Sequence, residues 1–536
     1  MNTSISKRII LVAVGLLAAW QTLALAGSSL EVDLREQEPL PDGSGRFRVV
    51  CEQQQWDAEE TAIIICDMWD RHWCRGASER VAELAPVMNR VVSLARDKGV
   101  FIIHAPSGTV QHYEDHPARR RAKNAPRAAN LPEGIASWCR WKDATEKDVG
   151  YPVDHSDGGC DCESECEQGS PWTRQIAAIR IGEKDAISDS GVEIWNLLES
   201  RDIENVILMG VHANMCVLGR PFGLRNLANA GKNVVLMRDL TDTMYDSDDA
   251  PRVSHFTGTD LIVAHVERHV CPTVVSTILT GEPPFRFAED ERPLIVFLSA
   301  EREYKAVETL PVFARELEMR YRLDTEILQG STDGRGEARH EISGMEILSD
   351  AELLVVFARR RAFPADQMKH LREYLDRGGP LIGLRTASHA FDTRGNAPEG
   401  HEEWRDFDPE VLGGNYHGHY GRGPVTTVTA AAGAADHPIL AGIDLPLRSN
   451  GSLYKTGPLA DGTTLLLIGT IPDEEPEPVA WTNRYEDSRV FYTSLGHPDD
   501  FENFEFCELL VNATFWAMDE PMPAPKEESV ATAGTR

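Results

Sequence analysis

The sequence has little positive charge. Its 536 residues include 54 Lys and Arg against 85 Asp and Glu, which gives a formal net charge of −31. A surface of this sign repels phosphate groups, so we expect neither nucleic acid nor an anionic membrane as a partner. The same charge favours solubility.

Long apolar runs are missing beyond the N-terminus. Residues 1–26 combine Lys7, Arg8, the apolar run Ile9–Ala19 and the small-residue site Ala24–Ala26. This order is typical of a secretory signal, and the run is short for a membrane-spanning helix. We expect export to the periplasm or the cell exterior, cleavage after this site, and no membrane contact after cleavage. An uncleaved anchor is the alternative.

The chain is too long for one hydrophobic core, so two domains are expected. Short apolar runs alternate with helical patterns, which predicts an α/β fold with two doubly wound parallel-sheet domains in tandem. The predicted order is a signal peptide, 1–26; an irregular arm, 27–58; a first domain, 59–281, with a long insertion, 105–172; a linker, 282–292; a second domain, 293–519; and a disordered tail, 520–536.

A cysteine lies between a predicted strand and a predicted helix of the first domain. Val206–Met209 has strand length, Gly210 breaks it, and Cys216 precedes a helical pattern at Phe222–Ala230. Free backbone N–H groups and the helix dipole would stabilise a thiolate there. A helix that starts at Cys216 conflicts with Pro221, so either its first turn is irregular or it starts later. A small buried hydrophobic cysteine is the alternative interpretation.

Two more polar residues follow apolar runs in the same way. Asp67 follows Ala62–Cys66, and Lys184 follows Ile179–Ile181. The carboxyl ends of parallel strands share one edge of a sheet, where ligands bind. We therefore expect Asp67, Lys184 and Cys216 to meet at that edge. Leu261–His265 is predicted as a further strand.

The stretches IIICDMWD, IGEKDAISDSGVEIWNLLESRDIENVILMGVHANMCV and NVVLMRDLTDTM resemble the isochorismatase-like cysteine hydrolase family over about Thr61–Leu279. The resemblance implies a triad in which Cys216 is the nucleophile, Asp67 the general base and Lys184 the charge partner. The family acts on amides, ureido compounds and vinyl ethers. Export argues against isochorismate, so C–N hydrolysis of a small amide or ureido compound is the expected reaction.

The resemblance also implies an oxyanion-binding turn. Its backbone N–H groups lie near His212, Ala213 and Met215, and its cis peptide would be Val211–His212. Metal-dependent amidases of the family carry an Asp-x-His motif after the second strand, where this chain has HAPSGT. We therefore expect no catalytic metal and no cofactor. A homo-oligomer is compatible with the sequence.

The insertion 105–172 contains tryptophans and an acidic cysteine cluster. The tryptophans indicate an ordered segment, such as a lid over the site. Cys160, Cys162 and Cys166 could bind zinc with His155 as the fourth ligand, but the spacing is not a standard zinc pattern. A disulfide-tied loop is preferred, and a solvated acidic loop is the third interpretation.

The second half resembles the ThuA-like, or trehalose-utilisation, family, which has a class I glutamine amidotransferase-like (flavodoxin-like) fold. GGPLIGLRTASHAF, VLGGNYHGHY, DHPILAGI, PVAWTNRYEDSRVFYTSLGH and LLVNATFWAM carry the resemblance over about Arg292–Asp519. Arg385 occupies the position of the amidotransferase cysteine, and Gly451 and Ser452 replace an acidic pair. Because arginine is no nucleophile, we expect no amidotransferase activity.

A second ligand pocket is expected from residues near predicted strand ends. They are His389, Trp404, His417, His419 and His497. A sugar or another polar ligand is preferred over a metal, although His-x-His can bind one. Two alternatives to the hydrolase therefore stay open. One is a secreted two-module binding protein without catalysis, and the other is a carbohydrate-active second domain.

Overall fold

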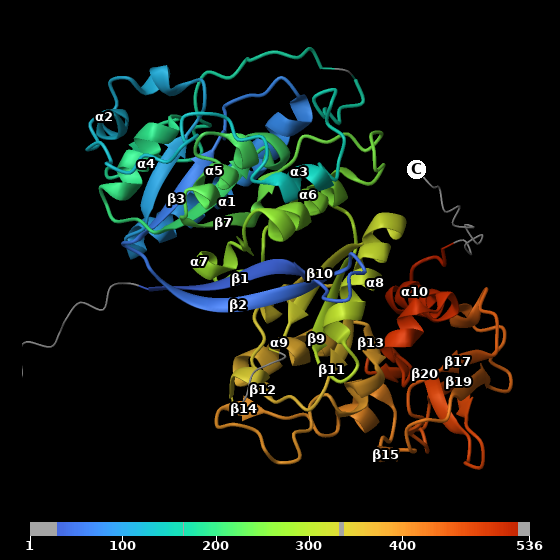
Figure 1. The fold of residues 1–536 in the computed structure, drawn as a ribbon. Coiled ribbons are helices and arrows are strands. Elements are labelled where there is room, and N and C mark those ends of the chain that lie inside the picture. Colours follow the sequence, from blue (N-terminus) through green and yellow to red (C-terminus); the bar gives the residue numbers. More distant parts are fainter. Residues whose placement is uncertain (1–28, 165, 332–336, 524–536) are drawn as a thin grey trace, which may run out of the picture.

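The computed structural model describes residues 29–164, 166–331 and 337–523 (Figure 1). It confirms the α/β class, with two sheets in separate amino- and carboxy-terminal regions. The expected signal peptide and residues 524–536 of the expected tail lie outside the described residues. Within the described ranges, no helix is long and apolar enough to cross a membrane.

The first sheet has a parallel core extended by an antiparallel hairpin. Its order is β2 (Phe47–Asp57), β1 (Ser29–Pro39), β8 (Thr273–Val274), β7 (Asn233–Asp242), β6 (Asn205–Val211), β3 (Thr61–Cys66), β4 (Phe101–Ala105) and β5 (Ala186–Ile187). Neighbouring strands from β8 to β5 run parallel, whereas β1 is antiparallel to both β2 and β8. The helices are α1 (Arg75–Lys98), α2 (Pro117–Lys123), α3 (Ala144–Val149), α4 (Gly191–Glu199), α5 (Leu224–Asn229), α6 (His255–His269) and α7 (Thr277–Thr280).

Both faces of this sheet are buried, which explains the continuous apolar runs. In β3, Ala62 and Ile64 pack in one core with α4, α5 and α6, whereas Ile63 and Ile65 pack in the other with α1. Helix α1 begins after Cys74, whose sulfur accepts the Ala77 N–H as an N-cap.

The prediction of an irregular arm at residues 27–58 is wrong, because residues 29–57 form the β1–β2 hairpin. Leu30, Val32 and Leu34 alternate with polar residues and are buried, as in a strand with one face in a core. The hairpin lies between the two domains (Figure 1). Arg35 joins them, since its guanidinium pairs with Glu267 of α6 at 3.0 Å and with Glu326 of the second-domain strand β10 (Asp324–Gln329) at 2.5 Å.

Two predicted strands are also wrong. Leu261–His265 lies inside α6, whose apolar side chains pack on the sheet; a buried run of that length suits either element. Ile179–Ile181 is irregular, and the strand of that region is β5 at Ala186–Ile187.

The second sheet is parallel on one side and antiparallel on the other. Its order is β10 (Asp324–Gln329), β9 (Leu294–Ala300), β11 (Leu353–Ala358), β13 (Leu381–Leu384), β21 (Ser488–Thr493), β20 (Glu477–Tyr485), β19 (Thr464–Thr470), β16 (Thr426–Ala430) and β17 (Leu447–Ser449). Helices α8 (Ala306–Tyr321) and α10 (Phe504–Met518) pack in one core, and α9 (Ala365–Asp376) packs in the other. Two short two-stranded sheets are β12 (Phe363–Pro364) with β14 (His401–Glu402), and β15 (Gly418–His419) with β18 (Tyr454–Lys455).

The expected linker, 282–292, contains neither helix nor strand but is fixed at both ends. Phe287 packs in the first-domain core. Arg292 is buried and pairs with Asp290 and Asp260, both at 2.7 Å.

Candidate active site at the carboxyl edge of the first sheet

The turn after β6 presents Cys216. The Val211–His212 peptide is cis, as expected, and Ala213–Val217 forms one π-helical turn. The α-helix starts later, at Leu224, which confirms the later start that was one of the two alternatives drawn from Pro221. Cys216 is therefore not at the start of an α-helix, and the predicted help from a helix dipole is absent.

Asp67 lies at the end of β3 and faces this turn. It is fully buried and has a positive φ of 50°. The Ser107 N–H donates to Oδ1 at 2.7 Å. The Cys216 thiol lies near this carboxylate, whose charge acts on the pKa of the thiol. The structure thus brings two of the three expected triad residues together.

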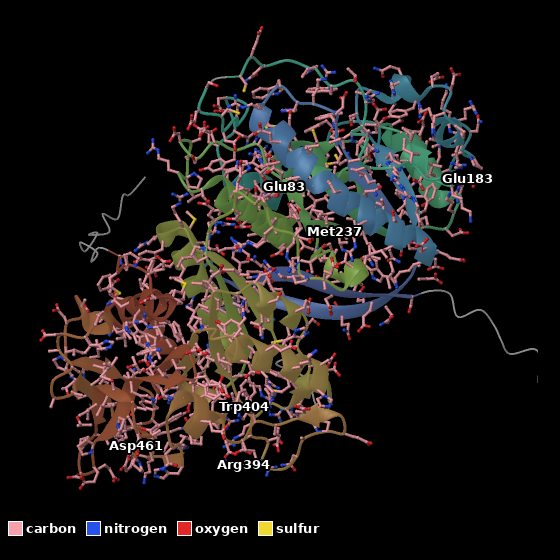
Figure 2. The ribbon with its side chains drawn as sticks, turned by 180° about the vertical axis from the view of Figure 1, so that it is seen from behind. Glu83, Glu183, Met237, Arg394, Trp404 and Asp461 are labelled. Carbon is pink, nitrogen blue, oxygen red and sulfur yellow. The ribbon has the colours of Figure 1, made fainter. Side chains whose placement is uncertain are left out.

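Lys184 is not part of this group. It is exposed and lies two residues before Ala186, which pairs with Ile103 of β4. Asp67 lies beyond Ala105 at the opposite end of the same strands, about five residues or about 15 Å away along the sheet. Figure 2 shows the neighbouring Glu183 at the outer edge of the first domain. The motif places Lys184 before a strand instead of after one, because Ile179–Ile181 is not a strand.

Arg220 supplies the positive charge that the resemblance assigned to Lys184. Its Nη2 and Nε both lie 2.9 Å from Asp67 Oδ2. Arg220 follows Cys216 by four residues, and its N–H donates to the Cys216 carbonyl at 3.0 Å. One turn of chain therefore carries both the thiol and the cation.

The thiol and the carboxyl are both held toward their neutral forms. Burial, and then the Asp67 charge, raise the pKa of Cys216 well above the usual range of a thiol. Burial also raises the pKa of Asp67, and the Arg220 charge opposes that rise. Both shifts favour a protonated thiol at rest, in contrast to the expected thiolate, chiefly because the thiol is buried.

Aromatic rings form a wall beside the turn. Trp69 stacks on Trp172 with ring centroids 4.4 Å apart, and His72 lies 4.7 Å from His212. Burial lowers the pKa of His212 to about 3 and that of His72 to about 4, so both rings are neutral at pH 7. In the described part of the chain, Nε2 of the buried His212 has no hydrogen-bond partner. Ala213 is buried and Met215 half-buried in the same turn.

The insertion covers the other side, as a lid would. The Trp138 ring lies over the Arg220 guanidinium at 5.6 Å and is 49% exposed. The Cys139 N–H donates to the Gly219 carbonyl at 2.8 Å. A Cβ on Gly219 would lie 2.4 Å from the Trp138 ring, so the contact requires glycine. The insertion contains the short helices α2 and α3 and is anchored by Glu146, whose carboxylate meets Arg225 at 2.5 Å and His265 at 2.9 Å.

None of the ten cysteines forms a disulfide, so the expected disulfide-tied loop is wrong. Cys160 and Cys162 instead lie beside Cys74 at the start of α1. His155, the expected fourth ligand, stands against the Tyr151 ring outside this group.

A cluster of polar and aromatic side chains surrounds the elbow residue of the second domain. Arg385 follows β13 with a positive φ of 42°, and its guanidinium lies over Tyr304 at 4.1 Å and Tyr454 at 4.6 Å. His389 stacks on Tyr416 at 4.5 Å. Burial lowers the pKa of His389 well below its usual range.

The other residues that were predicted to line a ligand pocket lie in different environments. Trp404 is a core residue that packs on Phe407, far from the first domain in Figure 2. His417 and His419 are exposed, and in the described ranges they belong to no group of three clustered metal-ligating side chains. His497 caps a 3₁₀ turn and lies 6.4 Å from Tyr304, at the pocket rim.

Comparison with known proteins supports the family resemblance of the second domain. The family model described as trehalose utilisation (ThuA) matches residues 335–517, which confirms that resemblance there. A comparison with curated proteins finds no match.

Solved structures resemble each half separately. The chain is similar to a ThuA-like protein from Parabacteroides merdae (16% identity, 44% of this chain and 92% of that one, TM-score 0.35). It is also similar to a cysteine hydrolase from Pseudomonas syringae pv. phaseolicola (16%, 41% and 91%, 0.26) and to an isochorismatase family protein from Desulfovibrio vulgaris (15%, 41% and 97%, 0.23). Similarities at this level assign no activity.

Proposed function

We propose that the first domain is a cysteine hydrolase that cleaves the C–N bond of a small amide or ureido compound. The observation that carries the proposal is the buried Asp67 carboxylate within reach of the Cys216 thiol. A buried acid beside a buried thiol is costly to maintain for structure alone. It suits a pair that exchanges one proton during a reaction.

The first half of the reaction uses the proton of the thiol. Cys216 Sγ attacks the substrate carbonyl carbon while its proton passes to Asp67. The oxyanion is held by backbone N–H groups of the turn from His212 to Cys216. The C–N bond then breaks, and the leaving amine takes the proton from Asp67, leaving a thioester.

The second half restores the enzyme. Water attacks the thioester and gives a proton to Asp67, and the carboxylic acid leaves as Cys216 regains its proton. Arg220 stabilises the negative charge that Asp67 and the sulfur share throughout. Because the thiol rests protonated, attack and proton transfer occur together, and the pair needs no preformed thiolate.

Ammonia release from a panel of small primary amides and ureido compounds tests the proposal. The wild-type protein should release ammonia from at least one member, and Cys216→Ala should release none. Release that persists in Cys216→Ala but disappears in His389→Ala would move the activity to the second domain.

The side chains around Arg385 favour a ligand-binding role for the second domain. Arg385 stands where the related fold has its nucleophile, and the rings of Tyr304, His389 and Tyr416 surround it. Aromatic faces beside a fixed guanidinium suit a sugar or another polar ligand. Calorimetric titration with trehalose and other small sugars, on wild type and His389→Ala, tests this role. Export through residues 1–26 belongs to the same proposal, and N-terminal sequencing of the mature protein tests it.

A further inference from the structure

Three cysteine sulfurs converge at the start of α1, outside the hydrolase pair, and a fourth cysteine follows in the same loop. The Sγ atoms of Cys74, Cys160 and Cys162 all lie within 4.8 Å of one another. Cys166 is near enough to act on the pKa of the Cys160 and Cys162 thiols, but its Sγ donates to the Ser164 carbonyl at 3.8 Å and lies outside this group of three. Cys74 is more than eighty residues from the others in sequence, so the fold alone brings the set together.

We propose that Cys74, Cys160, Cys162 and Cys166 bind one zinc ion as a structural site. Three of these sulfurs already lie as close together as the ligands of one metal ion, and Cys166 would complete the set. Sulfurs at 2.3 Å from a tetrahedral zinc are about 3.8 Å apart. The Cys74–Cys162 separation is 3.8 Å. A disulfide would require these sulfurs at about 2.05 Å.

Backbone donors around the sulfurs suit thiolates. The Gly76 N–H donates to Cys162 Sγ at 3.3 Å, and the Ala77 N–H donates to Cys74 Sγ at 3.5 Å. Both donors belong to the first turn of α1, a helix of 24 residues, where the dipole favours negative charge. Such N–H···S contacts orient and stabilise metal-bound sulfur.

The loop that carries three of the sulfurs is built to lie here. Asp161 pairs with Arg80 of α1 at 2.7 Å, and Arg80 pairs with Asp242 at the end of β7 at 2.9 Å. A Cβ on Gly159 would lie 2.4 Å from the Met244 carbonyl oxygen, so the approach requires glycine. These contacts fix the loop beside α1. Cys74 Sγ also donates to Asp161 Oδ1 at 3.7 Å, a contact that a metal-bound thiolate would give up.

The site would tie the insertion to the hydrolase turn. Met215, next to Cys216 in sequence, packs with Cys160 and Cys162 in the small cluster around Cys74. Zinc would therefore hold the loop against both α1 and the turn. Four thiols release protons on binding, so affinity should fall in acid. Because metal content is measured directly, the proposal stands or falls independently of any hydrolase activity.

The test is metal analysis of the full-length protein, purified under reducing conditions without added metal. Inductively coupled plasma mass spectrometry should find about one zinc per chain. Cys74→Ser should lose most of the zinc. Because Cys74 is buried and its substitution could disturb the fold, Cys166→Ser, at a half-buried position, is the second variant and should also lose most of the zinc. The control Cys139→Ser, in the same insertion but outside the cluster, should keep it. Strong chelation should also speed proteolysis within residues 150–175 of the wild type.

Three results would overturn the proposal. One is a zinc content near zero in the wild type. Another is iron or copper in place of zinc. The third is a disulfide between any two of the four cysteines, found by peptide mass spectrometry of protein alkylated before reduction.

Discussion

Arg220 Nη2 lies 2.9 Å from Asp67 Oδ2, and this pair is the charged centre of the hydrolase site. Asp67 is fully buried, whereas the Arg220 side chain keeps 26% of its surface exposed. The cation is therefore partly open to solvent, whereas the carboxylate is enclosed near the thiol. Two variants separate this arrangement from the triad that the sequence suggested.

Arg220→Met should make Cys216 less reactive, whereas Lys184→Met should leave it unchanged. Loss of a cation this close shifts a pKa by at least about one unit, so alkylation at pH 8 should slow about tenfold. The measurement is the pH profile of iodoacetamide labelling, with mass spectrometry to locate Cys216. In the wild type its midpoint should lie above the ordinary thiol value of about 8.5. Slower labelling in Lys184→Met alone would restore the sequence-based triad.

Gly210→Ala should be strongly destabilising, because a Cβ there would lie 2.1 Å from the Cys66 carbonyl oxygen. We expect a loss of about 3 kcal/mol or more from the combined clash and backbone strain. Gly231→Ala is the control: it has a positive φ of 86° but open space around it, and should lose roughly 1–2 kcal/mol. Urea denaturation measures both, and equal losses would mean that β3 and β6 do not approach so closely.

Glu146→Gln should weaken the anchor of the insertion. It leaves the buried Arg225 guanidinium without a carboxylate, which typically costs about 3–5 kcal/mol. Exposed Glu133→Gln, in the same insertion, is the control and should change little. Thermal denaturation at pH 7 provides the comparison.

The stabilisation by Glu146 should depend on pH. His265 and Arg225 lower the pKa of Glu146 to about 2 against the burial that raises it. Its folded pKa lies below the unfolded value of about 4.3, so its stabilisation is complete above about pH 5 and lost as pH falls toward 2. The stability gap between wild type and Glu146→Gln should therefore shrink below pH 4. A gap that stays constant down to pH 2 would mean that Glu146 is not ionised in the fold.

The second domain should show no glutaminase activity. Arg385 follows β13 at the elbow, and its guanidinium donates to the Ser494 carbonyl at 2.6 Å instead of presenting a nucleophile. Incubation of the full-length protein carrying Cys216→Ala with glutamine should release no ammonia above buffer. Release above that level would contradict the account of the pocket.

Apolar runs predicted much of the fold, because local patterns determine such strands. Ala62–Cys66 lies in β3 and Val206–Met209 in β6, as expected. Leu30 and Val32 alternate with charged residues, a strand pattern that the expected irregular arm did not include. A buried apolar run does not distinguish strand from helix, which is why α6 was predicted as a strand.

Site residues that directly follow a strand could be predicted from the sequence. Residues that reach the site through contacts distant in sequence could not. Asp67 and Cys216 each follow a strand and meet. The predicted position of Lys184 in the triad is wrong, because the sequence motif does not show whether the lysine precedes or follows a strand. Arg220 could have been found from its spacing of four residues after Cys216. Cys74 could not, because only the tertiary fold brings it to the other cysteines.

The most direct test of the hydrolase is acid-quench mass spectrometry of the protein with an amide that it turns over. A thioester on Cys216 should accumulate in the wild type, with a mass equal to the acyl part of that amide. Asp67→Asn should form it on the order of 10²–10⁴-fold more slowly. Turnover without an adduct on Cys216, at a rate that Asp67→Asn leaves unchanged, would contradict the account.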